Sequence, residues 1–143
     1  MRRGFMRAFT RAVGALRRAA GASSERSRVR SSRRVSGADT IVATPSGWTA
    51  LVRAGTPWLA TAGSGDVLGG VLGAMIAGAA AGAALDAEAL GPLAASGAWV
   101  HGRAGVVAAH AEAGPGHPIV ALDVVGALPA VIQALLERRH ETG

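Results

Sequence analysis

The sequence contains no cysteine, lysine or tyrosine, and its aromatic side chains are two Phe and three Trp. Without cysteine the chain has no disulfide scaffold, no thiol nucleophile and no cysteine-ligated metal. The four histidines show no HExxH spacing, which excludes a helix-borne zinc site of that kind. The chemistry that remains open is that of hydroxyl, carboxylate and backbone groups.

Arginine supplies all the basic side chains of the 143-residue chain, and its distribution is uneven. Residues 1–34 contain eleven of the 15 arginines and a single acid, Glu25, whereas the rest of the chain contains four arginines and eight acids. The net charge of +6 therefore comes from the N-terminal segment, and the rest of the chain is net negative. Half of all residues are apolar, and this length is typical of one domain, which we expect over residues 35–143.

The Arg-rich segment 1–34 is interpreted as a disordered leader. Three alternatives stay open for this Arg-rich, nearly acid-free segment. Its apolar residues Phe5, Phe9, Val13 and Leu16 share one face of a possible amphipathic helix. Such a segment also suits a membrane surface, a mitochondrial transit peptide or an arm that neutralises nucleic-acid phosphates. No motif for specific nucleic-acid recognition is present. No apolar secretory segment follows the charges, so we expect a cytoplasmic protein.

After residue 35 the pattern predicts a β-hairpin followed by three helices. The β-prone runs 39–43 and 48–52 are separated by the turn residues 44–47. Apolar residues at helical spacing follow residue 66. A second helix is expected from Pro92 to about Ala111, and a third after Asp123 as its N-cap. Trp58 and Trp99 are expected in the core, Trp48 on a strand with one exposed face, and Asp86, Glu88 and Glu112 as solvated helix-end charges.

Residues 67–85 contain no charged side chain, and their length alone would allow a membrane span. Most of them are Gly or Ala, which transfer poorly into lipid, and no aromatic belt or adjoining basic cluster flanks them. We therefore expect a buried core helix and no transmembrane span. Its small side is expected to lie against another backbone; that side is made of Gly69, Gly70, Gly73, Ala74, Ala77 and Gly78.

The sequence Gly63-Ser64-Gly65-Asp66 lies where an extended segment meets the start of a helix. Two glycines allow a tight turn, and its amides together with the free N–H groups of the first helical turn form an anion site. Phosphate is the expected anion. Asp66 is either the helix N-cap or a base that takes a proton from a substrate hydroxyl while the amides hold a phosphoryl group.

The wider segment Gly55-Thr56-Pro57-Trp58-Leu59-Ala60-Thr61-Ala62-Gly63-Ser64-Gly65-Asp66-Val67-Leu68 resembles the GNPxLATxGSGDVL signature of the ADP-dependent (S)-NAD(P)H-hydrate dehydratases of the ribokinase-like superfamily. Further matches follow in the same order. Residues 37–43 resemble the KGxxTxVA strand, His101 to Gly105 resemble the HGxAG segment, and residues 121–129 resemble the ASDLLxALP ending.

This resemblance implies a fold and a reaction. The fold is a ribokinase-like αβα sandwich of the α/β class, of which residues 35–143 would form the C-terminal part. The reaction is dehydration of the NADH or NADPH hydrate with ADP or ATP and Mg²⁺, the hydroxyl being phosphorylated first and phosphate then eliminated. Asp66 would contact the hydrated nicotinamide and act as the catalytic base. Nucleotide binding would involve Ser36, Gly37, Ala38, Asp39, Thr40, Gly63, Ser64 and Gly65; no metal ligand is assigned.

The chain also departs from the family pattern. Ser36 stands in place of the usual Lys, Thr56 in place of Asn, and Val106 where many members have Asp. No run of β-α units precedes residue 37. A non-catalytic remnant or half domain, which associates with a missing N-terminal half or with a second copy, is therefore an alternative. Another is a small-molecule kinase of the same superfamily, typified by GAGDxF. His101 is expected to be a packing residue rather than a catalytic one.

Overall fold

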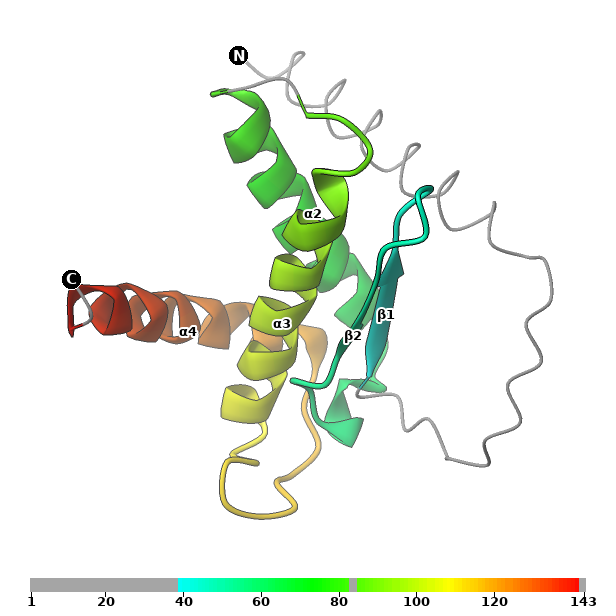
Figure 1. Cartoon of the computed structure of the whole chain (residues 1–143). Coiled ribbons are helices and arrows are strands. Elements are labelled where there is room, and N and C mark those ends of the chain that lie inside the picture. The colour runs from blue at the N-terminus through cyan, green and yellow to red at the C-terminus, as the bar shows by residue number, and fades with distance from the viewer. Residues whose placement is uncertain (1–38, 83–84, 142–143) are drawn as a thin grey trace, which may run out of the picture.

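The computed structural model describes residues 39–82 and 85–141 (Figure 1). The strands β1 (Thr40–Ala43) and β2 (Thr49–Val52) are followed by the 3-10 helix η1 (Pro57–Leu59) and by the helices α2 (Ser64–Ala80), α3 (Leu90–Ala108) and α4 (Ala121–Glu141). The predicted order of a hairpin and three helices is confirmed, and it is compatible with part of an α/β fold. The expected leader 1–34, and Ser36, Gly37 and Ala38, lie outside the described residues.

The hairpin is antiparallel, with Thr40 opposite Val52 and Ala43 opposite Thr49. Its turn is closed by a hydrogen bond from the Thr44 amide to the Trp48 carbonyl, 2.9 Å long. Gly47 in this turn has φ of 93°, a conformation that residues with a Cβ rarely adopt. The turn is one residue longer than the sequence predicted, because Trp48 lies outside β2.

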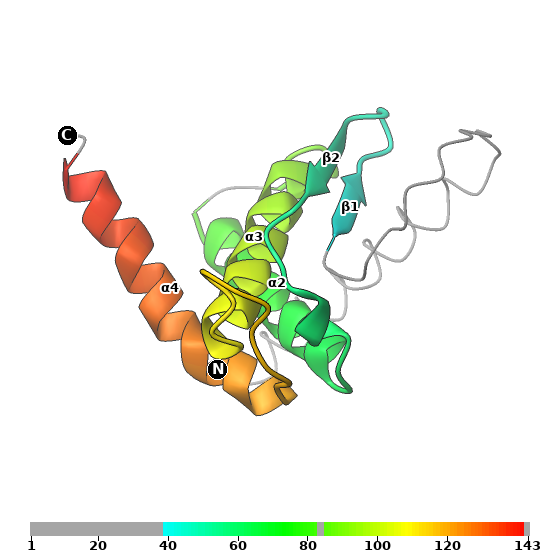
Figure 2. The same cartoon turned by 90° about the horizontal axis from the view of Figure 1, so that it is seen from below.

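Helix α3 is the centre of the arrangement and contacts every other described element. In both views α2 and the hairpin lie beside α3, whereas α4 projects away from them (Figures 1 and 2). The main core lies between α3 and α4 and is built from small side chains, with Val124 the largest that is fully buried. Its buried members are Ala104, Ala109, Ile119, Val124, Ala127 and Val131.

Close approaches between elements occur at glycines of α3. A Cβ at Gly102 would lie 2.9 Å from the backbone of Ala54 and Gly55, and one at Gly97 would lie 2.6 Å from Leu72 of α2. The close approach predicted for the small side of α2 is wrong at Gly69, Gly70 and Gly78, where no described residue lies within 4 Å of an added Cβ. The sequence shows the glycines, but only the packing shows which of them a neighbour contacts.

The helix ends differ slightly from the prediction. Helix α3 begins at Leu90, and the Asp86 carboxylate accepts a hydrogen bond from the Ala89 amide at 2.7 Å in the turn before it. Asp123 is not the N-cap of α4 but lies in its first turn, where its carboxylate accepts the Val120 amide at 2.8 Å. Among the described helices, none has the length and apolar character needed to cross a membrane.

Candidate functional site

The loop before α2 has the geometry expected for a turn that opens a helix. Gly63 is the N-cap residue and has φ of 84°, in the left-handed region, so that Ser64 becomes the first helical residue. Just upstream, Thr56 is the N-cap of η1. Thr56 is buried, and its hydroxyl accepts a hydrogen bond from the Trp58 amide at 3.5 Å. The loop therefore lies between the 3-10 helix η1 and the first turn of α2.

Several amides of this loop are already used by neighbouring backbone. The Ser64 amide donates to the Thr61 carbonyl at 3.3 Å, and the amides of Asp66 and Val67 both donate to the Gly63 carbonyl at 3.1 Å. The Gly65 amide makes no hydrogen bond with another described residue. Fewer free amide donors than predicted therefore remain for an anion, and the Gly65 amide is one of them.

Asp66 is the third residue of α2, and its side chain is exposed. The N-cap interpretation is wrong, because Gly63 occupies that position and no side chain caps the helix. A carboxylate in the first turn is stabilised by the partial positive charge of the helix N-terminus. Since no described residue bonds to the Asp66 carboxylate, it is accessible to a ligand in front of the loop.

A pocket of about 170 Å³, here named the loop pocket, brings together part of the predicted nucleotide-binding set. Thr40 of β1 lines it together with Ser64, Gly65 and His101. This volume is smaller than the 300 to 1,000 Å³ typical of sites for whole small molecules, so it suits a phosphoryl group. Thr40 is separated from Ser64 by more than twenty positions in sequence, and the hairpin carries it to the loop.

The other candidate residues are placed differently. Asp39 lies in the partly exposed segment before β1 and approaches Arg53, with 3.8 Å between Oδ2 and Nε. Gly63 adjoins the loop pocket without lining it. Asp66 does not line it either, and lies instead at one end of a second cavity.

That second cavity, here named the helix groove, has a volume of about 730 Å³ and is formed by α2, α3 and α4. Apart from Asp66, its lining is apolar, with side chains such as Val71, Val100 and Leu128. The first turn of α2 therefore borders two cavities of different character, the loop pocket at Ser64 and Gly65 and the helix groove at Asp66. One is small and partly polar, and the other is larger and apolar.

His101 supports the loop from α3 and is 7% exposed. Its Nε2 lies 3.0 Å from the Ser64 carbonyl oxygen and 3.4 Å from Ser64 Oγ. Burial lowers the pKa of His101, and the hydrogen bond with the Ser64 carbonyl opposes that shift. A neutral imidazole that donates from Nε2 to the carbonyl fits this geometry, and it gives His101 a positioning role consistent with the expected packing residue.

Sequence reasoning missed the pairing of His101 with Ser64, because the two residues are 37 positions apart. The signal was present in part, since both residues belong to recognisable segments, but one sequence does not show that these segments touch. Within the described residues, no group of three or more His, Asp or Glu side chains is arranged to hold a metal ion.

Comparison with known proteins identifies a family. The sequence model of the NAD(P)H-hydrate dehydratase family matches residues 22–122, which is well over half of the chain. The matched range includes the hairpin, η1, α2 and α3 and ends just after α4 begins. No curated protein and no solved structure is significantly similar to the chain.

Proposed function

Because the chain belongs to the NAD(P)H-hydrate dehydratase family, we propose that it converts the hydrate of NADH or NADPH to the intact coenzyme, with ADP, or alternatively ATP, as the phosphoryl donor. The observation that carries the proposal is the position of Asp66. This exposed carboxylate stands at the start of α2 and lines the helix groove, and the two residues before it, Ser64 and Gly65, line the loop pocket. The ribokinase-like architecture is part of the same proposal and rests on the family match.

The loop pocket suits the phosphoryl group that is transferred. The free amide of Gly65 and the N-terminus of α2 favour an anion there, and Thr40 adds a hydroxyl from the hairpin. Ser64 contributes position rather than charge, because His101 forms a hydrogen bond with its carbonyl. The remaining nucleotide contacts are proposed for the segment from Ser36 to Asp39.

The helix groove suits the uncharged ring of the hydrated nicotinamide, because its lining is apolar except at Asp66. In the proposed reaction Asp66 accepts the proton of the ring hydroxyl while that oxygen attacks the terminal phosphorus of ADP. The bond from this phosphorus to its bridging oxygen breaks, and AMP leaves. Elimination of phosphate, with loss of a proton from the adjacent ring carbon, then restores the double bond.

Mg²⁺ usually binds nucleotides through phosphate oxygens and water with only one or two protein carboxylates. Since the described residues contain no metal-binding cluster, we propose that Mg²⁺ arrives with the nucleotide, where it would offset phosphate charge. No protein ligand is assigned to it. The described residues act in the reaction by orienting the phosphoryl group and accepting the hydroxyl proton.

The test is an assay of the full chain with NADH hydrate and ADP, in which the absorbance of the NADH formed measures turnover. Asp66→Asn should lower turnover by at least 100-fold, because general bases contribute about 10² to 10⁴-fold, and should leave ADP binding unchanged. Glu137→Gln is the matched control, since it removes a carboxylate from an exposed position on α4. Turnover by Asp66→Asn equal to that of the control would remove Asp66 as the base.

A second candidate function is that of a half domain that works only with a partner. Large apolar side chains are exposed on α4 and on the hairpin, including Leu122 at 77% and Ile41 at 67%. Burying such surface yields about 25 cal/mol per Å², so association with a complementary chain or a second copy would be favourable. No turnover by the wild-type chain, together with a mass above the monomer in light scattering, would support this candidate.

A further inference from the structure

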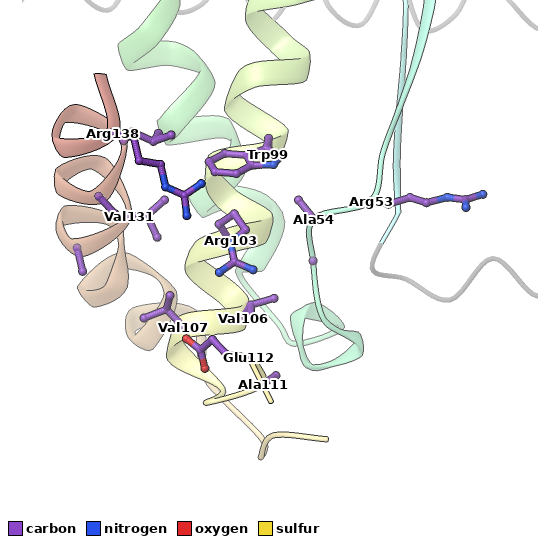
Figure 3. A pocket seen from close by; sticks show the side chains of 14 residues that line it. Arg53, Ala54, Trp99, Arg103, Val106, Val107, Ala111, Glu112, Val131 and Arg138 are labelled. Carbon is purple, nitrogen blue, oxygen red and sulfur yellow. The ribbon is translucent and has the colours of Figure 1, made fainter. Parts of the chain in front are cut away.

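Three of the four arginines that follow residue 34 line a single cavity away from the loop. This cavity, here named the arginine pocket, has a volume of about 630 Å³. It lies between α3, α4 and the segment that follows β2 (Figure 3). Its arginines are Arg53, Arg103 and Arg138, and its one acid is Glu112. Residues 35–143 contain twice as many acids as arginines, so this concentration of positive charge is a local feature of a net negative region.

Arg103 is the central cation of the pocket. Figure 3 shows its side chain leaving α3 into the space that Arg138 enters from α4. Arg103 is partly buried, and it forms no hydrogen bond or ion pair with any other described residue. Glu112 lines the same cavity but lies outside ion-pair distance of Arg103. An anion in the cavity would therefore offset the charge of Arg103, which no described residue pairs.

The rest of the wall is apolar and includes an aromatic ring. Trp99, which was expected in the core, is 36% exposed, and its indole lies at the edge of the arginine pocket (Figure 3). Val107 and Leu135 line the pocket from α3 and α4. A cavity of this size, with an apolar wall and a few charged groups, has the character of a small-molecule site. It offers charge for an anionic group and surface for an uncharged body.

The arginine pocket is distinct from the candidate catalytic site. It shares Ala54 and Gly55 with the loop pocket, but none of Ser64, Gly65 and Asp66 lines it. The segment that contains Ala54 and Gly55 lies between the two cavities, pressed against Gly102 of α3. An occupant of the arginine pocket would therefore contact one side of this segment while the loop pocket lies on the other.

We propose that the arginine pocket binds a phosphate monoester with an aromatic body. Guanidinium groups pair with phosphate oxygens through two parallel hydrogen bonds, and a partly desolvated Arg gains more from such a pair than an exposed one. Arg103 and Arg138 bind the phosphate from opposite walls, and the ring packs against Trp99. Carboxylates of the same shape bind more weakly, because they carry one negative charge instead of about two.

The experiment titrates the full chain with phenyl phosphate in a calorimeter, with benzoate and phenol as comparison ligands. We expect millimolar or tighter binding of phenyl phosphate, at least fivefold weaker binding of benzoate and no binding of phenol. Arg103→Met should weaken phenyl phosphate at least tenfold. Glu112→Gln should strengthen it about two- to threefold, since it removes the one carboxylate of the lining.

Arg53→Met is the matched control. It removes the same charge from the same lining, but Figure 3 shows the Arg53 side chain pointing away from the pocket. Its effect should stay within twofold. Equal losses in Arg53→Met and Arg103→Met would overturn the proposal in favour of a nonspecific charge effect, as would the absence of binding by the wild type. Should Arg103→Met unfold, as judged by circular dichroism, Arg138→Gln replaces it with the same expected loss.

Discussion

The carboxylate of Glu88 accepts a hydrogen bond of 2.6 Å from Oγ1 of Thr44, which fastens the turn of the hairpin to the segment that enters α3. The same carboxylate accepts the amide of Ser46 at 3.1 Å and its hydroxyl at 2.5 Å. Glu88 thus anchors the hairpin turn, whereas the sequence predicted only a solvated charge at a helix end. This matters for the site, because the hairpin carries Thr40 to the loop pocket.

These hydrogen bonds predict a loss of stability in acid. Those from Ser46 and Thr44 lower the pKa of Glu88 below its ordinary value of 4.5. A carboxyl group with a lowered pKa stabilises the fold above its unfolded pKa, and this contribution disappears as the pH falls through the folded pKa. The melting temperature of the wild type should therefore drop below pH 4.5. In Glu88→Gln that part of the drop should be missing, whereas Glu137→Gln should keep it.

The contact of His101 with Ser64 predicts a second pH effect at a separate, higher range. Burial holds the pKa of His101 below 6.5, so the unfolded chain takes up a proton before the folded chain does. Stability should be full above pH 6.5 and should fall as the pH drops from there to the folded pKa. His101→Gln should abolish this dependence, because its amide keeps a donor for the Ser64 carbonyl without a titrating group. Stability curves by denaturant at several pH values measure it.

His101→Phe separates the hydrogen bond from the charge. It also removes the titration, but it takes away the second donor of the Ser64 carbonyl, which as the first residue of α2 keeps its helical hydrogen bond. A hydrogen bond of this kind contributes about 0.5 to 1.5 kcal/mol. The Phe variant should therefore be less stable than the Gln variant at every pH. Equal stability of the two would show that the Nε2 contact with Ser64 contributes nothing.

Gly102 and Gly69 form a matched pair of helical glycines with opposite expected effects. At Gly102 an added Cβ would lie 2.9 Å from backbone atoms of Ala54 and Gly55, so Gly102→Ala must displace that segment. Such overpacking costs about 1 to 3 kcal/mol. At Gly69 none of the residues that the structure describes lies within 4 Å of an added Cβ, and Ala is favoured over Gly in a helix by about 0.5 to 1 kcal/mol. Chemical denaturation should show loss for the first and gain for the second.

The order of elements could be predicted because it depends on local signals. Turn residues between two β-prone runs, and Gly63-Ser64-Gly65-Asp66 before an apolar stripe, are enough to place a hairpin and the start of α2. The predicted positions of the helix ends were less accurate. Asp123 and Asp66 both read as N-caps, but carboxylates also stabilise the first helical turn, and the structure places both residues there.

The site could be predicted only in part, because its contacts join distant segments. Ser64 and Gly65 were identified from their motif, but the approach of Thr40 and His101 to them depends on how the hairpin and α3 pack on the loop. The arginine pocket had no sequence signal at all. Arg53, Arg103 and Arg138 are far apart in the chain, and each alone is an ordinary charged surface residue.

The two glycines of the loop, Gly63 and Gly65, have different roles in the structure. Gly63 has φ of 84°, where a residue with a Cβ is strained by about 1 to 2 kcal/mol, and an added Cβ would lie 3.1 Å from that of Ala121. Gly65 is helical and has open space around an added Cβ, although it lines the loop pocket. Gly63→Ala should therefore lower the unfolding free energy, and Gly65→Ala should not.

The two variants should also differ in how they affect ADP binding. Gly65→Ala should act on the affinity directly, and Gly63→Ala should act through the fold. Gly65→Ala places a methyl group at the loop pocket of a fully folded chain, so its affinity for ADP should fall about three- to tenfold with no fall in melting temperature. For Gly63→Ala, any loss of affinity should come with a lower melting temperature, since the turn itself is displaced. Unchanged ADP affinity in Gly65→Ala would mean that the nucleotide phosphate does not approach this amide, and the loop pocket would lose its assignment as the phosphoryl site.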